Sequence, residues 1–173
     1  LLLTLVFAVA LAVQLLLKLW LSTRQVRHVA LHRNAVPAPF AHRIPLAAHQ
    51  KAADYTLSKA RLGLLQLALS TVMLLAWTVL GGLDLLHQLL LEKVGAGYTQ
   101  QLALLASFVL ISSVIDLPLS YYQTFVLEQR FGFNQMTPRM WLGDLLKSTL
   151  VSALIGLPLA FAVLWLMQTT GSL

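Results

Sequence analysis

The chain has 173 residues and no cysteine; 58% of its residues are hydrophobic, 10% are charged, and the formal net charge is +6. Soluble domains average roughly 45–50% apolar and about 25% charged residues, so this composition and a mean hydropathy of +0.79 exclude an ordinary soluble domain and indicate a membrane protein. The lack of cysteine excludes disulfides and thiolate metal sites, and the cations flank apolar runs, a pattern of cytoplasmic loops rather than of nucleic acid binding.

Residues 1–21 form the first predicted membrane span. Some 20 apolar residues, rising about 1.5 Å each, cross a hydrocarbon core of roughly 30 Å. Gln14 and Lys18 interrupt the run, and Lys18 and Trp20 near its end suit the membrane interface. The sequence begins without a methionine or the basic start of a signal peptide, and it ends abruptly after an apolar helix. We therefore expect a fragment of a longer protein.

Residues 22–61 form a basic connector in which Asp54 is the only acidic residue. Pro37, Pro39 and Pro45 divide it into an extension of the first helix, an irregular centre and a second helix that starts near Pro45. By the positive-inside rule this connector is cytoplasmic, which places the N-terminus outside. The basic residues of the connector are Arg24, Arg27, Arg33, Arg43, Lys51, Lys59 and Arg61.

The second and third spans are predicted at residues 62–80 and 102–122, on either side of a segment with four glycines. Gly81 and Gly82 should end the second span, because glycine favours helix ends. Residues 83–93 then form a short amphipathic piece, and Gly95 and Gly97 make the next break. The near absence of basic residues in this segment agrees with a location on the outer side of the membrane, opposite the cytoplasm.

A turn after the third span leads into the fourth. Gly132 fits the position just beyond a helix end, and Thr137 followed by Pro138 fits an N-cap and first helical residue. The new helix is interfacial through Lys147 and continues as a span over residues 148–167, in which Pro158 should bend it. The predicted fold is an all-α transmembrane bundle of four spans with cytoplasmic interfacial helices, and both ends lie outside.

The third span carries one polar face. On a helical wheel its polar residues fall within a sector of roughly 120°, opposite the apolar ones. Such a face is either a packing seam of small hydroxyl residues or the wall of a hydrated cavity. Asp116 favours the cavity, because a carboxylate is costly in lipid. The candidate chamber-lining residues are Ser112, Asp116, Ser120, Gln123 and Thr124, and the same sector holds Ser113 and Arg130.

Other polar patterns are incomplete as sites. His28 and His32 have the spacing of the H-E-x-x-H zinc motif, but Val29 stands where the motif needs glutamate. A zinc site needs three or four convergent ligands, and no acidic residue lies near, so both histidines are predicted to be solvated or to face lipid headgroups. We therefore predict no catalytic residue and no metal ligand in this chain. Two acid–base pairs fit surface ion pairs better than catalysis, namely Glu128 with Arg130 and Asp144 with Lys147.

The third span and the turn contain a recognisable pattern. From Thr124 to Thr137 the sequence follows T-F-V-x-E-x-x-x-G-F-N-x-x-T. It resembles the N-terminal membrane domain of the type I CAAX prenyl proteases, which are zinc metalloendopeptidases of the gluzincin kind. Residues 49–59, which begin H-Q-K-A-A-D-Y and end near Lys59, resemble the bacterial branch of that family. The residues that carry this signature are Tyr121, Phe125, Glu128, Gly132, Phe133, Asn134, Thr137, Asp144 and Lys147.

The resemblance implies a helical membrane enzyme that encloses a hydrated chamber and holds zinc through H-E-x-x-H and a later glutamate. It implies cleavage of prenylated or membrane-associated proteins. This chain has neither H-E-x-x-H nor a third-ligand glutamate, so no catalytic residue can be assigned to it. Residues 1–173 would then be one N-terminal transmembrane domain, whose partners are the lipid bilayer, a missing C-terminal zinc-protease domain and the protein or peptide substrate.

Two functions are therefore weighed. The first is the anchoring and chamber-forming part of a zinc metalloendopeptidase, located in a bacterial inner membrane and without a cofactor of its own. The second is a small membrane transport or scaffold protein that uses Asp116 in a polar cavity. The protease interpretation predicts an H-E-x-x-H motif in the longer protein, whereas the transport interpretation predicts a complete chain of about this length.

Overall fold

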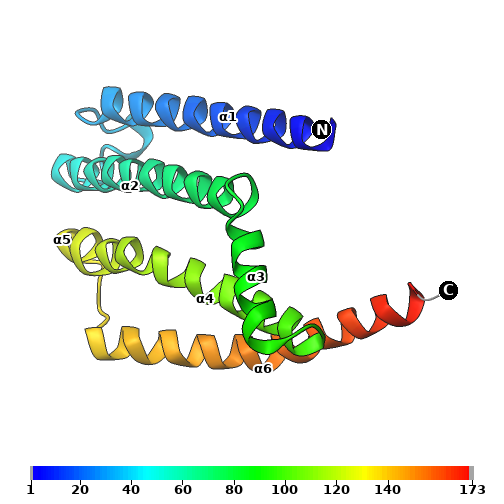
Figure 1. Ribbon diagram of the computed structural model, residues 1–173. Helices are drawn as coiled ribbons and strands as arrows, with labels where there is room; N and C mark the ends of the chain where they lie inside the picture. Colours follow the sequence, from blue (N-terminus) through cyan, green and yellow to red (C-terminus); the bar gives the residue numbers. More distant parts are fainter. Residues whose placement is uncertain (1, 172–173) are drawn as a thin grey trace. The chain divides into compact units, whose positions relative to one another are not determined.

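A computed structural model describes residues 2–171 of the chain. Within these residues every regular element is helical, and Leu1, Ser172 and Leu173, which the predicted domain limits include, lie outside the description. The elements are α1 (Leu2–His32), the 3₁₀ turn η1 (Ala38–Phe40), α2 (Leu46–Thr78), α3 (Gly82–Val94), α4 (Tyr98–Tyr122), the π-helical turn η2 (Gln123–Glu128), α5 (Gln129–Phe131) and α6 (Pro138–Thr170) (Figure 1).

Four of the described helical segments are long and apolar enough to cross a membrane, which confirms the all-α prediction with four spans. They cover Leu5–His32, Leu46–Thr78, Tyr98–Phe131 and Pro138–Thr170. Each is longer than the predicted span, because hydropathy marks only the apolar part of a helix that continues into polar sequence. A helix of 33 residues is about 50 Å long, well beyond a hydrocarbon core of roughly 30 Å.

The helix ends lie close to the predicted residues. α3 lies between Gly81 and Gly95, so it forms the expected short piece between two glycine breaks. The hydroxyl oxygen of Thr137 accepts a hydrogen bond from the backbone nitrogen of Met140 at 3.3 Å, which confirms the N-cap of α6. α6 bends in its second half, shown in orange to red in Figure 1, where Pro158 lacks the N–H that a straight helix needs.

The helix that contains α4 changes its repeat at residue 123. Up to Tyr122 the backbone is α-helical, and from Gln123 to Glu128 it forms a π-helical turn. Each backbone hydrogen bond of such a turn joins residues five positions apart, instead of four as in an α-helix. One residue corresponds to about 100° of rotation on an α-helix. The constant repeat assumed for the helical wheel therefore does not hold beyond Tyr122, so the wheel does not give the angular position of Arg130.

Contacts divide the chain into two compact units. Unit 1 comprises the residues up to Val72 together with Tyr122–Asn134, and unit 2 comprises Met73–Tyr121 together with the residues from Gln135 onward. Unit 2 is held together by aromatic pairs at ring-centroid distances of 5.2 to 5.9 Å. These pairs are Trp77 with Phe108, Tyr98 with Phe161, and Tyr121 with Trp141.

Candidate functional site

The signature turn at Gly132 ends the helix in a Schellman motif. Gly132 has φ 78° and ψ 21°, a left-handed conformation that glycine adopts without a steric penalty. Its N–H donates to the carbonyl of Gln129 at 3.0 Å, and the N–H of Phe133 donates to the carbonyl of Glu128 at 2.9 Å. The N–H of Asn134 reaches the same Glu128 carbonyl at 3.3 Å. Glycine is thus needed here for its backbone conformation. Its own N–H satisfies the carbonyl of Gln129, and the two residues after it satisfy that of Glu128.

Tyr55 of α2 holds this turn through its ring. The ring lies 5.3 Å from that of Phe131 and 4.8 Å from that of Phe133, both in edge-to-face arrangements. The ammonium of Lys59, one helical turn further along α2, lies 5.6 Å from the centre of the same ring. The two segments that carry the family resemblance, residues 49–59 and the turn at Gly132, therefore meet at Tyr55.

α2 runs antiparallel to the η2–α5 segment in unit 1. Tyr55 pairs with Phe131, and Gln66, further along α2, donates to the side-chain oxygen of Gln123 at 3.2 Å. The buried core of the unit lies along this pairing, and each segment contributes apolar side chains to it. The residues of this core are Ala53 and Leu62 of α2, and Leu127 and Phe131 of η2–α5.

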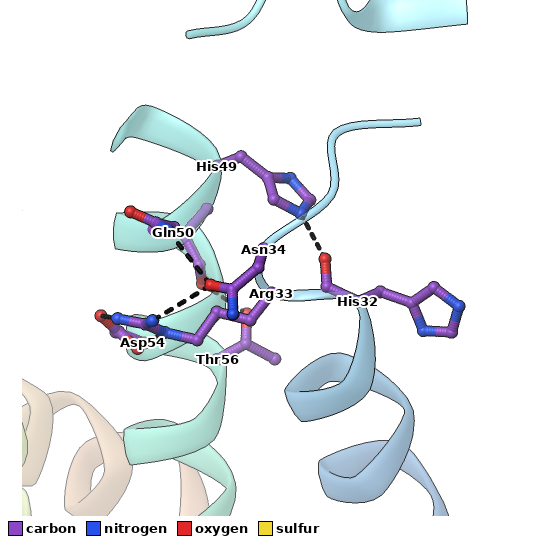
Figure 2. Close-up of polar contacts among 8 residues, drawn as sticks. His32, Arg33, Asn34, His49, Gln50, Asp54 and Thr56 are labelled. Atoms are coloured by element: carbon purple, nitrogen blue, oxygen red, sulfur yellow. Dashed lines mark hydrogen bonds and ion pairs between the residues drawn. The ribbon is translucent and has the colours of Figure 1, made fainter. Parts of the chain in front are cut away.

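An ion pair joins the end of α1 to α2. Arg33 donates from Nε to one carboxylate oxygen of Asp54 at 2.6 Å and from a terminal nitrogen to the other at 2.8 Å (Figure 2). This bidentate geometry is the strongest that a guanidinium and a carboxylate form. The hydrogen bond to Asp54, and then the charge of its carboxylate, raise the pKa of Arg33 above its ordinary value. Both oxygens of the connector's only carboxylate are thereby engaged.

Further polar contacts beside this ion pair fix the connector on the first turns of α2. Gln50 donates to the side-chain oxygen of Asn34 at 3.1 Å, and a ring nitrogen of His49 lies 3.0 Å from the carbonyl oxygen of His32 (Figure 2). The segment H-Q-K-A-A-D-Y therefore acts as a clamp, because its His49, Gln50 and Asp54 hold the connector and its Tyr55 holds the turn.

A pocket of about 430 Å³ opens between α2 and α5 in unit 1. Three cations reach it, and the carboxylate of Asp54 is its only acid. Arg130 also lies 5.9 Å from the ring centre of Phe131, which places the guanidinium against the turn. The polar residues at the pocket are Lys51, Asp54, Ser58 and Arg61 of α2 and Arg130 of α5.

The predicted chamber-lining residues lie in different surroundings. On α4, Asp116 and Ser120 are exposed and Ser112 is half-buried, and the carboxylate of Asp116 makes no hydrogen bond or ion pair to another described residue. In η2, Thr124 is half-buried and Gln123 contacts Gln66 of α2, as a packing seam would require. The role of this face in lining a chamber stays a prediction.

The remaining signature residues support the turn and the start of α6. Phe125 and Glu128 are half-buried in η2 and the ring of Tyr121 contacts Trp141, whereas Asp144 and Lys147 are exposed on α6. Among the described residues Arg33–Asp54 is the one ion pair, so neither Glu128–Arg130 nor Asp144–Lys147 forms the pair that the sequence allowed.

The histidines do not form a metal site within the part of the chain that the structure describes. No three His, Cys, Asp or Glu side chains are grouped there as metal ligands. The rings of His28 and His32 lie 4.3 Å apart, and Nδ1 of His32 is 2.8 Å from the carbonyl oxygen of His28. The donor set therefore does not fit zinc, which needs three or four ligands.

Sequence reasoning missed two polar contacts that join distant residues. Arg33 and Asp54 are 21 positions apart, and only their opposite charge could have suggested a pair. His87, to which no role was assigned, contacts Gln100 at 2.8 Å, and the side chain of Gln100 is buried. A glutamine after a glycine break gives no sequence signal for burial.

The sequence of this chain is similar to that of a known protein family. Residues 25–173 match the family described as CAAX prenyl protease N-terminal, five membrane helices. CAAX prenyl protease 1 of Saccharomyces cerevisiae is 43% identical over 65 residues, which cover 38% of this chain and 14% of that protein. Its homologue in Oryza sativa is 30% identical over 159 residues, which cover 88% of this chain and 37% of that protein.

A solved structure has the same fold. The crystal structure of Ste24p from S. mikatae matches 92% of this chain with a TM-score of 0.83 at 24% identity, and the match covers 38% of that chain. The chain therefore spans less than two fifths of the length of these relatives. The matches do not favour a small transport or scaffold protein. The family match over residues 25–173 and the four membrane-spanning helices show that the chain belongs to the CAAX prenyl protease N-terminal family and is a membrane domain of that family.

Proposed function

We propose that this chain anchors an integral membrane zinc metalloendopeptidase and forms part of the wall of a hydrated intramembrane chamber. Asp116 carries the proposal: its carboxylate is exposed on the apolar helix α4 and has no partner among the described residues. A charge in this position is costly against lipid and is tolerated against water. Ser112 and Ser120 lie on the same face of the α-helix, one turn before and one turn after Asp116.

The catalytic part of the proposal concerns the full-length enzyme. Zinc would be held by H-E-x-x-H and a further glutamate in another part of that enzyme, where it would supply the activated water for peptide hydrolysis. The substrates proposed are prenylated or membrane-associated proteins, as the name of the relatives suggests. The role of this chain is to hold the helices and to present the turn at Gly132 to the catalytic domain.

The proposed orientation places the connector in the cytoplasm and the N-terminus outside. Seven basic residues between Arg24 and Arg61 face a single acidic one, Asp54, and short loops with such an excess stay on the cytoplasmic side. A bacterial inner membrane remains our prediction for the location, from the resemblance of residues 49–59.

Proteolysis by the full-length protein tests the catalytic proposal. Purified in detergent and supplied with a farnesylated peptide, it should cleave the peptide, lose this activity with a zinc chelator, and regain it when zinc is restored. A peptide without the prenyl group serves as the control for substrate class. Cleavage that survives complete chelation would contradict the proposal, as would no cleavage of either peptide by zinc-loaded protein.

A cysteine-labelling scan tests the chamber wall. This chain has no cysteine, so single cysteines at residues 112, 116 and 120 would be unique in it, in a full-length background freed of other thiols. A thiol reacts with maleimide as the thiolate, which forms only in contact with water. We expect labelling at these positions by a water-soluble maleimide to be several times faster than at Ile111 and Val114, which are exposed apolar positions of the same helix. Equal rates at all five positions would contradict a hydrated face.

A further inference from the structure

The pocket between α2 and α5 combines three features of an anion site. It is concave, with a volume of about 430 Å³, within the range of small-molecule sites. Lys51, Arg61 and Arg130 all line it. Arg33–Asp54 is the one ion pair among the described residues, so none of these three cations is paired with a carboxylate there.

The acid at this pocket is hydrogen-bonded to Arg33, and Arg130 interacts with it only through space. Asp54 lines the pocket, but Arg33 engages both of its carboxylate oxygens from the end of α1. The pocket therefore retains an excess of positive charge from side chains on two different elements. Clustered unpaired cations repel each other and gain from an anion that they can share.

The position of the pocket along α2 indicates which anion it meets. Arg61 is the last charged residue of α2, and the apolar stretch that follows reaches to Thr78 without another charge. The pocket thus begins where the membrane core ends and extends from Arg61 to Lys51, on the order of 15 Å along the helix. Its Arg61 end lies at the depth of the lipid headgroups, a layer of roughly 5–8 Å on each side of the core, and its Lys51 end reaches the water beyond them.

The other side chains of the lining complete an amphipathic site. Ser58 offers a hydroxyl to a phosphate oxygen, and Leu57 and Phe131 provide an apolar wall. Guanidinium groups bind phosphate oxygens in bidentate fashion, and Arg61 and Arg130 approach from α2 and α5 respectively. We propose that this pocket binds the phosphate-bearing headgroup of an anionic membrane phospholipid, with Leu57 and Phe131 as the apolar side of the headgroup site. The proposal does not depend on the proteolytic activity.

Titration of the full-length protein in detergent tests the site. The probes are short-chain phosphatidylglycerol, short-chain phosphatidylcholine and inorganic phosphate, and the readout is the Kd. We expect phosphatidylglycerol to bind more tightly than both other probes. Removing one cation with Arg61→Gln should raise its Kd about fivefold, and removing all three with Lys51→Gln, Arg61→Gln and Arg130→Gln should raise it on the order of a hundredfold.

A matched variant removes three charges elsewhere in the connector. Arg24, Arg27 and Arg43 are exposed and do not line the pocket, so their replacement by glutamine should change the Kd less than about threefold. An equal loss in both triple variants would assign binding to the general basic surface and overturn the proposal. Inorganic phosphate binding as tightly as phosphatidylglycerol would assign the pocket to a free anion, and equal binding of phosphatidylcholine would remove the anionic preference. If the triple pocket variant does not fold, the single variant Arg61→Gln decides, and an unchanged Kd for phosphatidylglycerol would overturn the proposal.

Discussion

Replacing Tyr55 by alanine should release the turn at Gly132 from α2. The ring of Tyr55 makes edge-to-face contacts with Phe131 and Phe133, each worth about 0.5–1.5 kcal/mol, and its removal also leaves space beside the buried Phe131. We expect a loss of about 2–3 kcal/mol in the free energy of unfolding, and a Tm lower by roughly 2–5 °C, for the full-length protein in detergent. Amide hydrogen exchange at Phe133 and Asn134, whose N–H groups bond to Glu128, should become faster.

Tyr55→Phe is the matched control for this experiment. It keeps the ring and both aromatic contacts and removes only the hydroxyl, so exchange at the two amides should stay close to that of the unchanged protein. If Tyr55→Ala left the amide exchange and the Tm unchanged, the turn would be held by something other than this ring. If Tyr55→Phe were as damaging as alanine, the hydroxyl rather than the ring contacts would be responsible.

Gly132→Ala should be the next most damaging change. The backbone of Gly132 has φ 78°, and a residue with a side chain in that conformation costs about 1–2 kcal/mol. A Cβ at this position would meet only the ammonium of Lys51, at an ordinary distance of 3.9 Å, so the cost is conformational and not a clash. We expect chemical unfolding to show a loss of about 1–2 kcal/mol.

Two further substitutions separate conformation from bulk. Asparagine tolerates the left-handed conformation better than alanine, so Gly132→Asn should cost less despite its larger side chain. Gly63 lies inside α2 with open space around it, and Gly63→Ala should stabilise the protein by about 0.5–1 kcal/mol, the opposite sign. A larger loss for asparagine than for alanine at position 132 would show that space, not φ, decides.

The helix ends could be predicted because their chemistry is local. Gly132 in a left-handed conformation and Thr137 as an N-cap each depend on a few neighbouring residues, which the sequence displays directly. The helices extend beyond the predicted spans, because hydropathy reports where lipid begins and not where hydrogen bonding stops. α2 starts at Leu46, as predicted from Pro45, although its apolar part starts only at residue 62.

The site itself depends on contacts between distant residues, which the sequence does not display. Residues 49–59 were noticed only as part of a resemblance, and the turn at Gly132 was predicted as a helix end without its partner on α2. That Tyr55 lies between Phe131 and Phe133, and that Arg33 engages Asp54, follows from the pairing of elements 20 or more positions apart. The π-helical turn was also missed, because the residues from Gln123 to Glu128 are ordinary helix formers and wheel arithmetic assumes a fixed repeat.

The π-helical turn makes the number of residues before Gly132 as important as their identity. Because each of its hydrogen bonds encloses one more residue, the turn accommodates one residue that an α-helix of the same length would exclude. Deleting any one residue of this segment would favour α-helical bonding and rotate Phe131 by about 100° away from Tyr55. Between residues 123 and 128, the length of the chain is thus constrained in addition to the side chains that pack there.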